Sequence, residues 1–508
     1  MHLELLLGMA VSLDEDRVAV TGPDGDSLTT GELQSLAWNA AAAFRERGGT
    51  HVAFCDTNGL AYPVALFGAA IAHMPFVPLN YRLSDEQLSQ ILDDQDFVVL
   101  ASGEVRGRLQ RMDVQRLDVQ RLDEKRILDS EEFVANLAGV TEGPPFPEID
   151  PEEVALLLYT SGTTAAPKAA ILRHRHLAAY VIGTVEFGAA APGDAALLSV
   201  PPYHVAGVMN LLSNLYSGRR VVYLDAFDPQ RWLDTVRKES ITHAMVVPTM
   251  LARIVSVLGD ATADTPSLRT ISYGGGKMPA SVIEKALRLF PSVEFANAYG
   301  LTETSSTISV LGPEEHRLAL HSDDPVVRAR LGSAGLPLPG VEIEVRDVDG
   351  GVCAAGEAGD IFVRGEQVAG EYVGAGTRDG GWFSTRDRGY FDEGGYLFIE
   401  GRADDTIIRG GENIAPAEIE DVLLKNDQVT DCAVVGIEDE EWGQRIAAAV
   451  VLAEGAQTTA EDLRSFARLH LRGSKTPDVI VVLDDLPYTD TGKLLRRAVR
   501  DRLKIEGS

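Results

Sequence analysis

Short apolar runs that alternate with amphipathic stretches are the feature that most constrains how this chain can fold. Strand-like runs lie at 52–55, 97–100, 219–224 and 243–247, and helical spacing lies at 58–72, 229–239 and 248–258. Parallel strands need a crossover connection, which is usually a helix. The alternation therefore predicts an α/β protein with largely parallel sheets.

The pattern changes twice toward the C-terminus. Residues 342–346 and 359–364 alternate apolar and polar side chains between glycine-rich turns, which predicts antiparallel strands. Beyond Arg402 the predicted order is a helix at 416–426, a strand at 432–436 and a helix at 461–472. That order predicts a small α+β domain, and a chain of 508 residues has room for two or more domains.

The charge of the chain limits its partners. The formal net charge is −30, so the surface repels nucleic acid and anionic lipid, and neither is an expected partner. The same surface repels ATP at long range, so a nucleotide site here must supply strong local donors. A five-residue repeat within 112–123 predicts only a charged surface loop or an irregular helix.

The termini and cysteines indicate the compartment. Residues 1–11 are apolar but lack a cationic start, so they predict a buried first helix rather than a signal peptide. No run of about 18 apolar residues occurs, so no membrane-spanning segment is predicted. Cys55, Cys353 and Cys432 are far apart and lack metal-ligand spacing. We expect a cytoplasmic, reducing location.

One loop has the chemistry of a phosphate site. Residues 161–164 read Ser-Gly-Thr-Thr, follow an apolar strand at 154–159, and are expected to lead into a helix. Backbone N–H groups and hydroxyls on such a loop can donate to phosphate oxygens, and Lys168 adds a positive charge. The loop lacks the spacing of a Walker loop. Turns rich in Ser and Thr are common, so the loop alone does not decide the function.

Three further stretches carry candidate groups, each with a purely structural alternative. Tyr299 could stack on a purine and Glu303 could hold Mg²⁺, or the stretch could be a strand end and a helix cap. Asp387 could accept hydrogen bonds from both ribose hydroxyls, or lie in a hairpin with charged turns. Lys493 could stabilise charge on a phosphate, or be a solvated lysine.

In this order and at these separations, the four stretches resemble the adenylate-forming (ANL) superfamily, which includes acyl-CoA synthetases, aryl-CoA ligases and firefly luciferase. The resemblance covers nearly the whole chain, from 28–33 through 77–80 to Lys493. It implies a large N-terminal part of two α/β subdomains and a distorted β-barrel, with a small mobile α+β C-terminal domain. It also implies an AMP-binding domain of residues 1–402, a domain of residues 403–508, and a hinge near Asp404.

The resemblance implies a two-step reaction that uses ATP, Mg²⁺ and CoA. A carboxylate first attacks the α-phosphate of ATP, and a thiol then displaces AMP from the acyl-adenylate. The β- and γ-phosphates would be held by Thr160, Ser161, Gly162, Thr163, Thr164 and Lys168. The adenine and acyl region would be lined by Gly274, Gly275, Gly276, Asn297, Ala298, Tyr299 and Gly300.

The remaining implied roles belong to catalysis, ribose binding and CoA binding. Thr302 would contact the α-phosphate, Glu303 would bind Mg²⁺, and Lys493 would bridge the acyl carboxylate and the α-phosphate. The ribose would be bound by Asp387 with Arg402, and the pantetheine tunnel would be bordered by Gly410, Gly411 and Trp442. His204 would border the bound carboxylate, or it is a half-buried histidine satisfied by backbone.

Three positions depart from the family pattern. Ala165, Ala169 and Arg386 stand where the family has glycine, and each adds a Cβ that disfavours positive φ. Arg386 also adds bulk and charge beside the expected ribose site. The expected catalytic and nucleotide-binding side chains are all retained, so we expect an active enzyme.

The acid itself is less constrained. Residues 200–210 should border the acyl pocket; they contain no aspartate, which disfavours a free amino acid, and they are mostly small or apolar. A fatty acid is expected from family frequency, and an aryl or alicyclic acid also fits. The alternatives are an acyl-AMP ligase that loads an acyl carrier protein and a catalytically weak protein that binds nucleotide or acyl ligand. The sequence leaves the oligomeric state open, a homodimer included.

Overall fold

The computed structural model describes residues 1–508 except 94, 116–125, 138–146, 161–167, 374, 377, 410–411, 440–441, 490–493 and 507–508. A first sheet has the strand order β15-β14-β13-β12-β11-β9-β10-β1-β2. Its strands are β1 Val18–Thr21, β2 Ser27–Thr29, β9 Ala195–Leu198, β10 Arg220–Tyr223, β11 His243–Val246, β12 Thr270–Gly274, β13 Glu294–Leu301, β14 Ser306–Leu311 and β15 Leu336–Pro337. The run from β1 to β13 is parallel, and β2, β14 and β15 are antiparallel edges.

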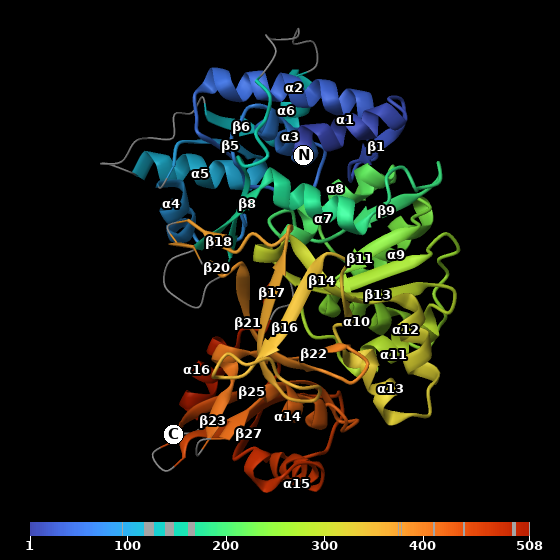
Figure 1. Ribbon diagram of the computed structural model, residues 1–508, viewed down its shortest axis with the longest axis vertical. Coiled ribbons are helices and arrows are strands. Elements are labelled where there is room, and N and C mark those ends of the chain that lie inside the picture. The colour runs from blue at the N-terminus through green and yellow to red at the C-terminus, as the bar shows by residue number, and fades with distance from the viewer. Residues whose placement is uncertain are drawn as a thin grey trace.

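A second sheet lies toward the N-terminal end of the molecule in the order β19-β18-β8-β7-β4-β3-β5-β6 (Figure 1). Its strands are β3 His51–Phe54, β4 Phe76–Pro78, β5 Phe97–Ala101, β6 Ile127–Asp129, β7 Val154–Thr160, β8 Lys168–Arg173, β18 Glu371–Tyr372 and β19 Ala375–Gly376. Strands β18 and β19 come from late in the chain; β18 pairs with β8, and β19 pairs with β18. Residues far apart in sequence therefore meet at this edge.

Helices cover and join these two sheets. The N-terminal helices are α1 Leu3–Leu13, α2 Thr30–Arg47, α3 Ala61–Ile71, α4 Asp85–Asp93, α5 Gly103–Gln115 and α6 Ser130–Leu137. The crossover helices are α7 His174–Thr184, α8 Val205–Ser217, α9 Pro229–Lys238, α10 Pro248–Leu258, α11 Ala280–Leu289, α12 Pro313–His321 and α13 Pro325–Ala329. One continuous hydrophobic core contains residues of both sheets. Every residue of α3 is buried, and the Tyr62 hydroxyl donates to the Pro202 carbonyl at 2.9 Å, which ties this helix to the first sheet.

A third sheet connects the large part to the C-terminal domain (Figure 1). It consists of β16 Val341–Arg346, β17 Gly359–Gly365, β20 Arg378–Asp379, β21 Trp382–Phe391 and β22 Leu397–Arg402. Its pairings are antiparallel, as the alternating pattern predicted. Within the described residues these pairings do not close, so the expected distorted barrel is here an open sheet.

The C-terminal segment forms the predicted α+β domain. It contains the hairpin β23 Ile407–Arg409 and β24 Glu412–Ile414, a sheet of β25 Val429–Asp439, β26 Gly443–Leu452 and β27 Val479–Val482, and the helices α14 Pro416–Leu423, α15 Ala460–His470 and α16 Arg496–Glu506. The two faces of its sheet carry separate hydrophobic clusters. The domain boundary at Arg402 stays a prediction, although β22 ends there.

Most predicted elements are confirmed, and one is wrong. The helix expected at 248–258 is α10, and the buried first helix is α1. The segment after the loop at 161–167 is strand β8 rather than a helix, because it pairs antiparallel with β7 and its consecutive apolar residues are covered on both faces of the sheet. Of the 112–123 repeat, residues up to Gln115 belong to α5 and the others lie outside the described residues. In the described part of the chain, no helix is both long and apolar enough to span a membrane.

Candidate functional site

Glu303 lies where the first and second sheets meet. Strand β13 ends at Leu301, and the short 3-10 turn Thr302–Thr304 carries Thr302 and Glu303. The Glu303 side chain is buried and accepts a short hydrogen bond from the hydroxyl of Tyr372 in β18. The Glu303 carbonyl accepts from the backbone N–H groups of Ala369 and Gly370, at 2.8 and 3.2 Å. The segment that leads into β18 therefore holds both the backbone and the carboxylate of Glu303.

A second carboxylate lies where the first and third sheets meet. Asp387 in β21 is only 7% exposed and accepts from the Tyr299 hydroxyl at 2.6 Å. Arg402, its register partner in β22, lies with Nε 3.1 Å from Asp387 Oδ1 and also donates to the Thr385 carbonyl at 3.0 Å. Burial raises the pKa of Tyr299 well above its ordinary value, and the charge of Asp387 raises it further. The phenol therefore stays protonated and donates.

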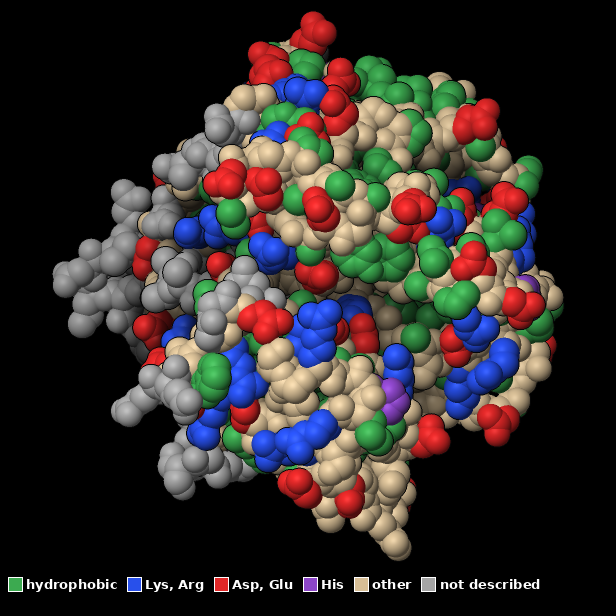
Figure 2. All heavy atoms as spheres, turned by 60° about the horizontal axis from the view of Figure 1, so that its bottom comes forward, with side chains coloured by type: hydrophobic (Ala, Val, Ile, Leu, Met, Phe, Trp, Pro, Cys, Tyr) green, Lys and Arg blue, Asp and Glu red, His purple; other side chains and the backbone are tan. Residues whose placement is uncertain are grey.

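The two carboxylates share one electrostatic environment. Burial, followed by the negative charge of Glu303, raises the pKa of Tyr372, while the positive charges of Arg386 and Arg402 lower it. The charges of Arg386 and Arg402, beside Asp387, thus act on Tyr372, which donates to Glu303. The shared region lies beyond the carboxyl end of β13, the edge of a parallel sheet where ligands usually bind. The face in Figure 2 shows acidic and basic side chains intermixed around a surface that is hollowed near its centre.

The predicted glycines divide into two groups. A Cβ on Gly274 would overlap the Ala298 carbonyl oxygen of the neighbouring strand, and one on Gly300 would overlap the backbone of Ser306. Strand packing therefore explains these two glycines. Gly275 and Gly276 follow β12 and are exposed, and a Cβ on either would make only ordinary van der Waals contacts. They leave the backbone accessible at the same sheet edge.

The expected acyl-pocket segment is largely core. His204 is the N-cap residue of α8, is half-buried, and lies with its ring 4.7 Å from the ring of Tyr203. Ala206 is also half-buried. The apolar residues that follow, Val208, Met209 and Leu211, are buried in the main hydrophobic core. Among these residues, only the start of α8 is placed to meet a ligand.

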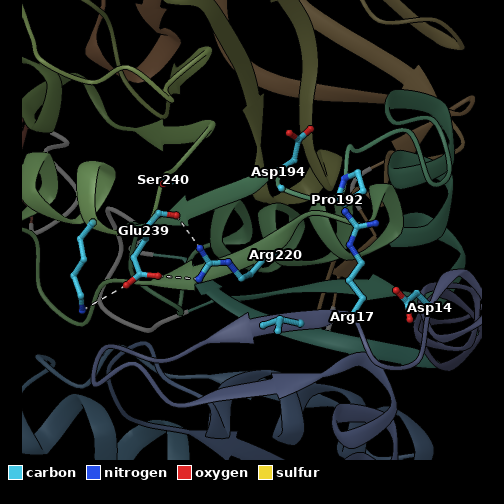
Figure 3. Close-up of a pocket in the computed structure, with 10 residues that line it drawn as sticks. Asp14, Arg17, Pro192, Asp194, Arg220, Glu239 and Ser240 are labelled. Carbon is cyan, nitrogen blue, oxygen red and sulfur yellow. Dashed lines mark hydrogen bonds and ion pairs between the residues drawn. The ribbon is translucent and has the colours of Figure 1, made fainter.

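A separate pocket lies at the opposite edge of the first sheet. It has a volume of about 580 Å³ and includes Arg17, Asp194, Arg220 and Glu239 (Figure 3). Asp194 and Arg220 stand at the amino ends of β9 and β10, away from the carboxyl edge described above. Arg220 pairs with Glu239 at 2.8 Å, and Arg17 donates to a backbone carbonyl, so the cations that line the pocket serve the fold.

The comparisons with known proteins agree with this geometry. The family model of the AMP-binding enzymes matches residues 9–373, and that of the AMP-binding enzyme C-terminal domain matches residues 418–493. The chain belongs to the adenylate-forming superfamily of AMP-binding ligases.

Its relatives use different acids and acceptors. It is 34% identical to the fatty acid–[acyl-carrier-protein] ligase ScoC of Streptomyces coeruleorubidus, over 94% of this chain and 92% of that protein. It is 33% identical to a feruloyl-CoA synthase of Amycolatopsis sp, over 94% of each chain. The structure of o-succinylbenzoate coenzyme A synthetase from Bacillus subtilis in complex with ATP and magnesium ion superposes with a TM-score of 0.82 at 28% identity, over 98% of this chain and 99% of that one.

The remaining predicted residues of this adenylate-forming chain are placed only in part. Thr160 ends β7, and Lys168 starts β8 with an exposed side chain. Asn297 donates from its amide to the Ser333 carbonyl at 2.9 Å, so it also supports a local turn. Trp442 is 46% exposed and lies under the guanidinium of Arg409, 5.6 Å from the ring centroid. Outside the described residues lie Ser161, Gly162, Thr163, Thr164, Gly410, Gly411 and Lys493.

The described side chains fit a nucleotide with its metal ion. Mg²⁺ usually takes one or two protein carboxylates together with phosphate oxygens, and Glu303 supplies one carboxylate from the turn that also carries Thr302. Asp387, held by two donors, presents a second carboxylate for hydroxyl donors. Tyr372 was missed by the sequence analysis. It lies 69 residues from Glu303 in the chain, and only the pairing of β18 with β8 brings it there.

Proposed function

We propose that the chain is an AMP-forming acid–CoA ligase. In the first step a carboxylate oxygen attacks the α-phosphorus of ATP, and the bond to pyrophosphate breaks. In the second step a thiol sulfur attacks the acyl carbon and gives up its proton to solvent. The bond from the acyl carbon to the phosphate oxygen breaks, and AMP departs with that oxygen. The observation that carries this proposal is the convergence of Glu303, Asp387 and Arg402 at one sheet edge, in a chain of this family.

Each group has a proposed task, and for Asp387 and Glu303 the described position supports it. Asp387, oriented by Tyr299 and Arg402, accepts hydrogen bonds from the ribose hydroxyls. Glu303 supplies the carboxylate for Mg²⁺, which neutralises phosphate charge when it is bound. Thr302 donates to the α-phosphate. Lys493 neutralises charge between the acyl carboxylate and the α-phosphate, so catalysis rests on positioning and electrostatics.

The second step would use the C-terminal domain. We propose that it turns about a hinge near Asp404, between domains of residues 1–402 and 403–508. The segment with Gly410 and Gly411 would then border CoA, with Trp442 nearby. The exposed ring of Trp442 supports a contact with a ligand, because exposed tryptophans are uncommon. The cytoplasm remains the predicted location.

For the acid, we propose a fatty acid. The fatty acid substrate named for the 34% identical ligase supports this choice. His204 and Ala206 at the start of α8 would border the carboxylate end. The feruloyl-CoA synthase relative supports an aryl acid instead, so acids of both classes belong in the assay.

A carrier protein is the second candidate acceptor. The 34% identical relative is named for transfer to an acyl carrier protein, whereas the other relative described above is named for CoA. The thiol in both cases ends a phosphopantetheine arm, so the two acceptors differ in what surrounds that arm. CoA is our first choice, and the assay compares both.

The experiment measures pyrophosphate and AMP release by the purified chain with ATP, Mg²⁺ and a panel of fatty and aryl acids, alone, with CoA, and with a phosphopantetheinylated acyl carrier protein. A thioester formed only with CoA supports the proposal. A thioester only with the carrier protein supports the second candidate. Nucleotide binding without pyrophosphate release supports the weak binding protein and contradicts the ligase.

Lys493→Ala tests the catalytic assignment. We expect acyl-adenylate formation to fall by a factor of about 100 or more, with an unchanged melting temperature. The control is Lys425→Ala, which removes an exposed lysine of the same domain. Near-normal pyrophosphate release by Lys493→Ala would contradict the assignment.

A further inference from the structure

Arg386 has an unfavourable backbone conformation. Its φ is +59°, in the left-handed region that costs a residue with a Cβ about 1–2 kcal/mol. Glycine adopts this conformation without that cost, and glycine is the residue that the family pattern has here. The chain therefore keeps an arginine where glycine would be more stable. Strain that persists in this way is typical of functional positions.

The charge of Arg386 is not paired within the described part of the fold. Its side chain is exposed, and among the described residues it makes no ion pair. Its neighbours differ in this respect. Arg388 lies 3.4 Å from a carboxylate oxygen of Asp360, and Arg402 pairs with Asp387 at 3.1 Å. In a chain with a net charge of −30, an exposed cation that has no carboxylate partner among the described residues is available to an anionic ligand.

The place of Arg386 is fixed by its neighbours. It directly precedes Asp387, whose carboxylate is bonded to Tyr299 of β13, the strand that leads to Glu303. The charge of Arg386 is also sensed by Tyr372, the residue that holds the Glu303 carboxylate. Arg386 thus adjoins the carboxylate assigned to ribose, and its charge reaches Tyr372, which holds the carboxylate assigned to Mg²⁺.

We propose that Arg386 binds the β- and γ-phosphates of the nucleotide, and the pyrophosphate that is released. This inference rests on the proposed function. A guanidinium can donate two parallel hydrogen bonds to phosphate oxygens, which a glycine cannot supply. The favourable contact offsets the backbone strain only when the ligand is bound.

The test compares substitutions of Arg386 in the full chain. Arg386→Asn removes the charge with a residue that tolerates positive φ, and Arg386→Lys keeps a charge. Dissociation constants for ATP, pyrophosphate and AMP are measured by calorimetry with Mg²⁺ at two salt concentrations. We expect Arg386→Asn to weaken ATP and pyrophosphate binding about tenfold or more, to leave AMP within about twofold, and to flatten the salt dependence. Arg386→Lys should recover most of the ATP affinity.

A second comparison separates strain from binding. Arg386→Gly should raise the melting temperature by about 2–4 °C while ATP binding weakens. The matched control is Ser240→Gly, which relieves a positive φ of 51° at an exposed residue of the opposite sheet edge. It should raise the melting temperature similarly and leave ATP binding unchanged.

Two results would overturn this inference and leave the proposed function intact. Equal weakening of AMP and ATP would mean that Arg386 only positions Asp387, and unchanged ATP and pyrophosphate binding by Arg386→Asn would mean that it binds no phosphate. A wild-type chain that binds no ATP would instead overturn the proposed function, and the inference with it.

Discussion

Tyr299→Phe removes one hydroxyl from the best-defined part of the site. That hydroxyl donates to Asp387 at 2.6 Å, and the carboxylate is only 7% exposed, so water cannot easily replace the lost donor. A hydrogen bond to a charged group contributes about 1.5–3 kcal/mol to stability. We expect a loss toward the lower end of that range, because Arg402 still lies 3.1 Å from the other carboxylate oxygen.

The assay is equilibrium unfolding in urea, followed by tryptophan fluorescence. Trp38, Trp232 and Trp382 all lie before Arg402, so the signal reports mainly on the large N-terminal part. The midpoint should fall at an unchanged slope, because the variant loses a bond and exposes no new surface on unfolding. AMP binding should weaken by up to about tenfold, since 1.4 kcal/mol corresponds to a factor of ten.

The matched control is Tyr390→Phe in the same strand. Tyr390 is half-buried and stacks on Phe398, with ring centroids 5.0 Å apart, and its hydroxyl has no hydrogen bond to any described residue. Its substitution should change stability by less than about 0.5 kcal/mol. If Tyr299→Phe proves as stable as this control, the hydrogen bond to Asp387 does not stabilise the folded chain, and the reasoning is refuted.

Three further predictions follow from packing and charge. Gly274→Ala should cost about 1–3 kcal/mol in thermal or urea unfolding, because its Cβ would overlap a backbone oxygen of β13, whereas Gly276→Ala should be tolerated. Burial lowers the pKa of His174 to about 3, below its ordinary 6.5, so its contribution to the free energy of unfolding is fully present above pH 6.5 and is lost as the pH falls. Between pH 6.5 and 5 the wild type should lose about 2 kcal/mol in urea titrations, and His174→Gln should not show this loss. Glu420→Ala leaves Arg496 without its buried partner in the C-terminal domain, and calorimetry should show that domain destabilised by about 3–5 kcal/mol.

Local patterns predicted many elements well, and their failures have a physical cause. The helix at 248–258 starts at a proline, which is favourable in a first turn, and α10 has the predicted bounds. The strand expected at 432–436 is the centre of the longer β25, because residues 429–431 and 437–439 are mostly polar and do not extend the apolar run. Strand β8 was mistaken for a helix because a short run of alanines and branched residues fits both periods until a partner strand is known.

Within the site, the sequence by itself determined which chemical groups are present. It identified Glu303 and Asp387 because side-chain chemistry and spacing along the chain are local properties, and the family resemblance added Arg402. It also marked Arg386 as a departure from glycine. That this arginine has an unfavourable backbone conformation follows only from its φ of +59° in the structure.

Only the tertiary structure decided which of these groups meet. Tyr299 and Asp387 are 88 residues apart, and Tyr372 and Glu303 are 69 apart, yet each pair shares a hydrogen bond. These contacts arise where strands of different sheets are brought together, the first and second by the main core and the first and third by smaller clusters around Tyr299. A sequence pattern reports the period of a single element, whereas the meeting of two sheets depends on the packing of all the elements between them.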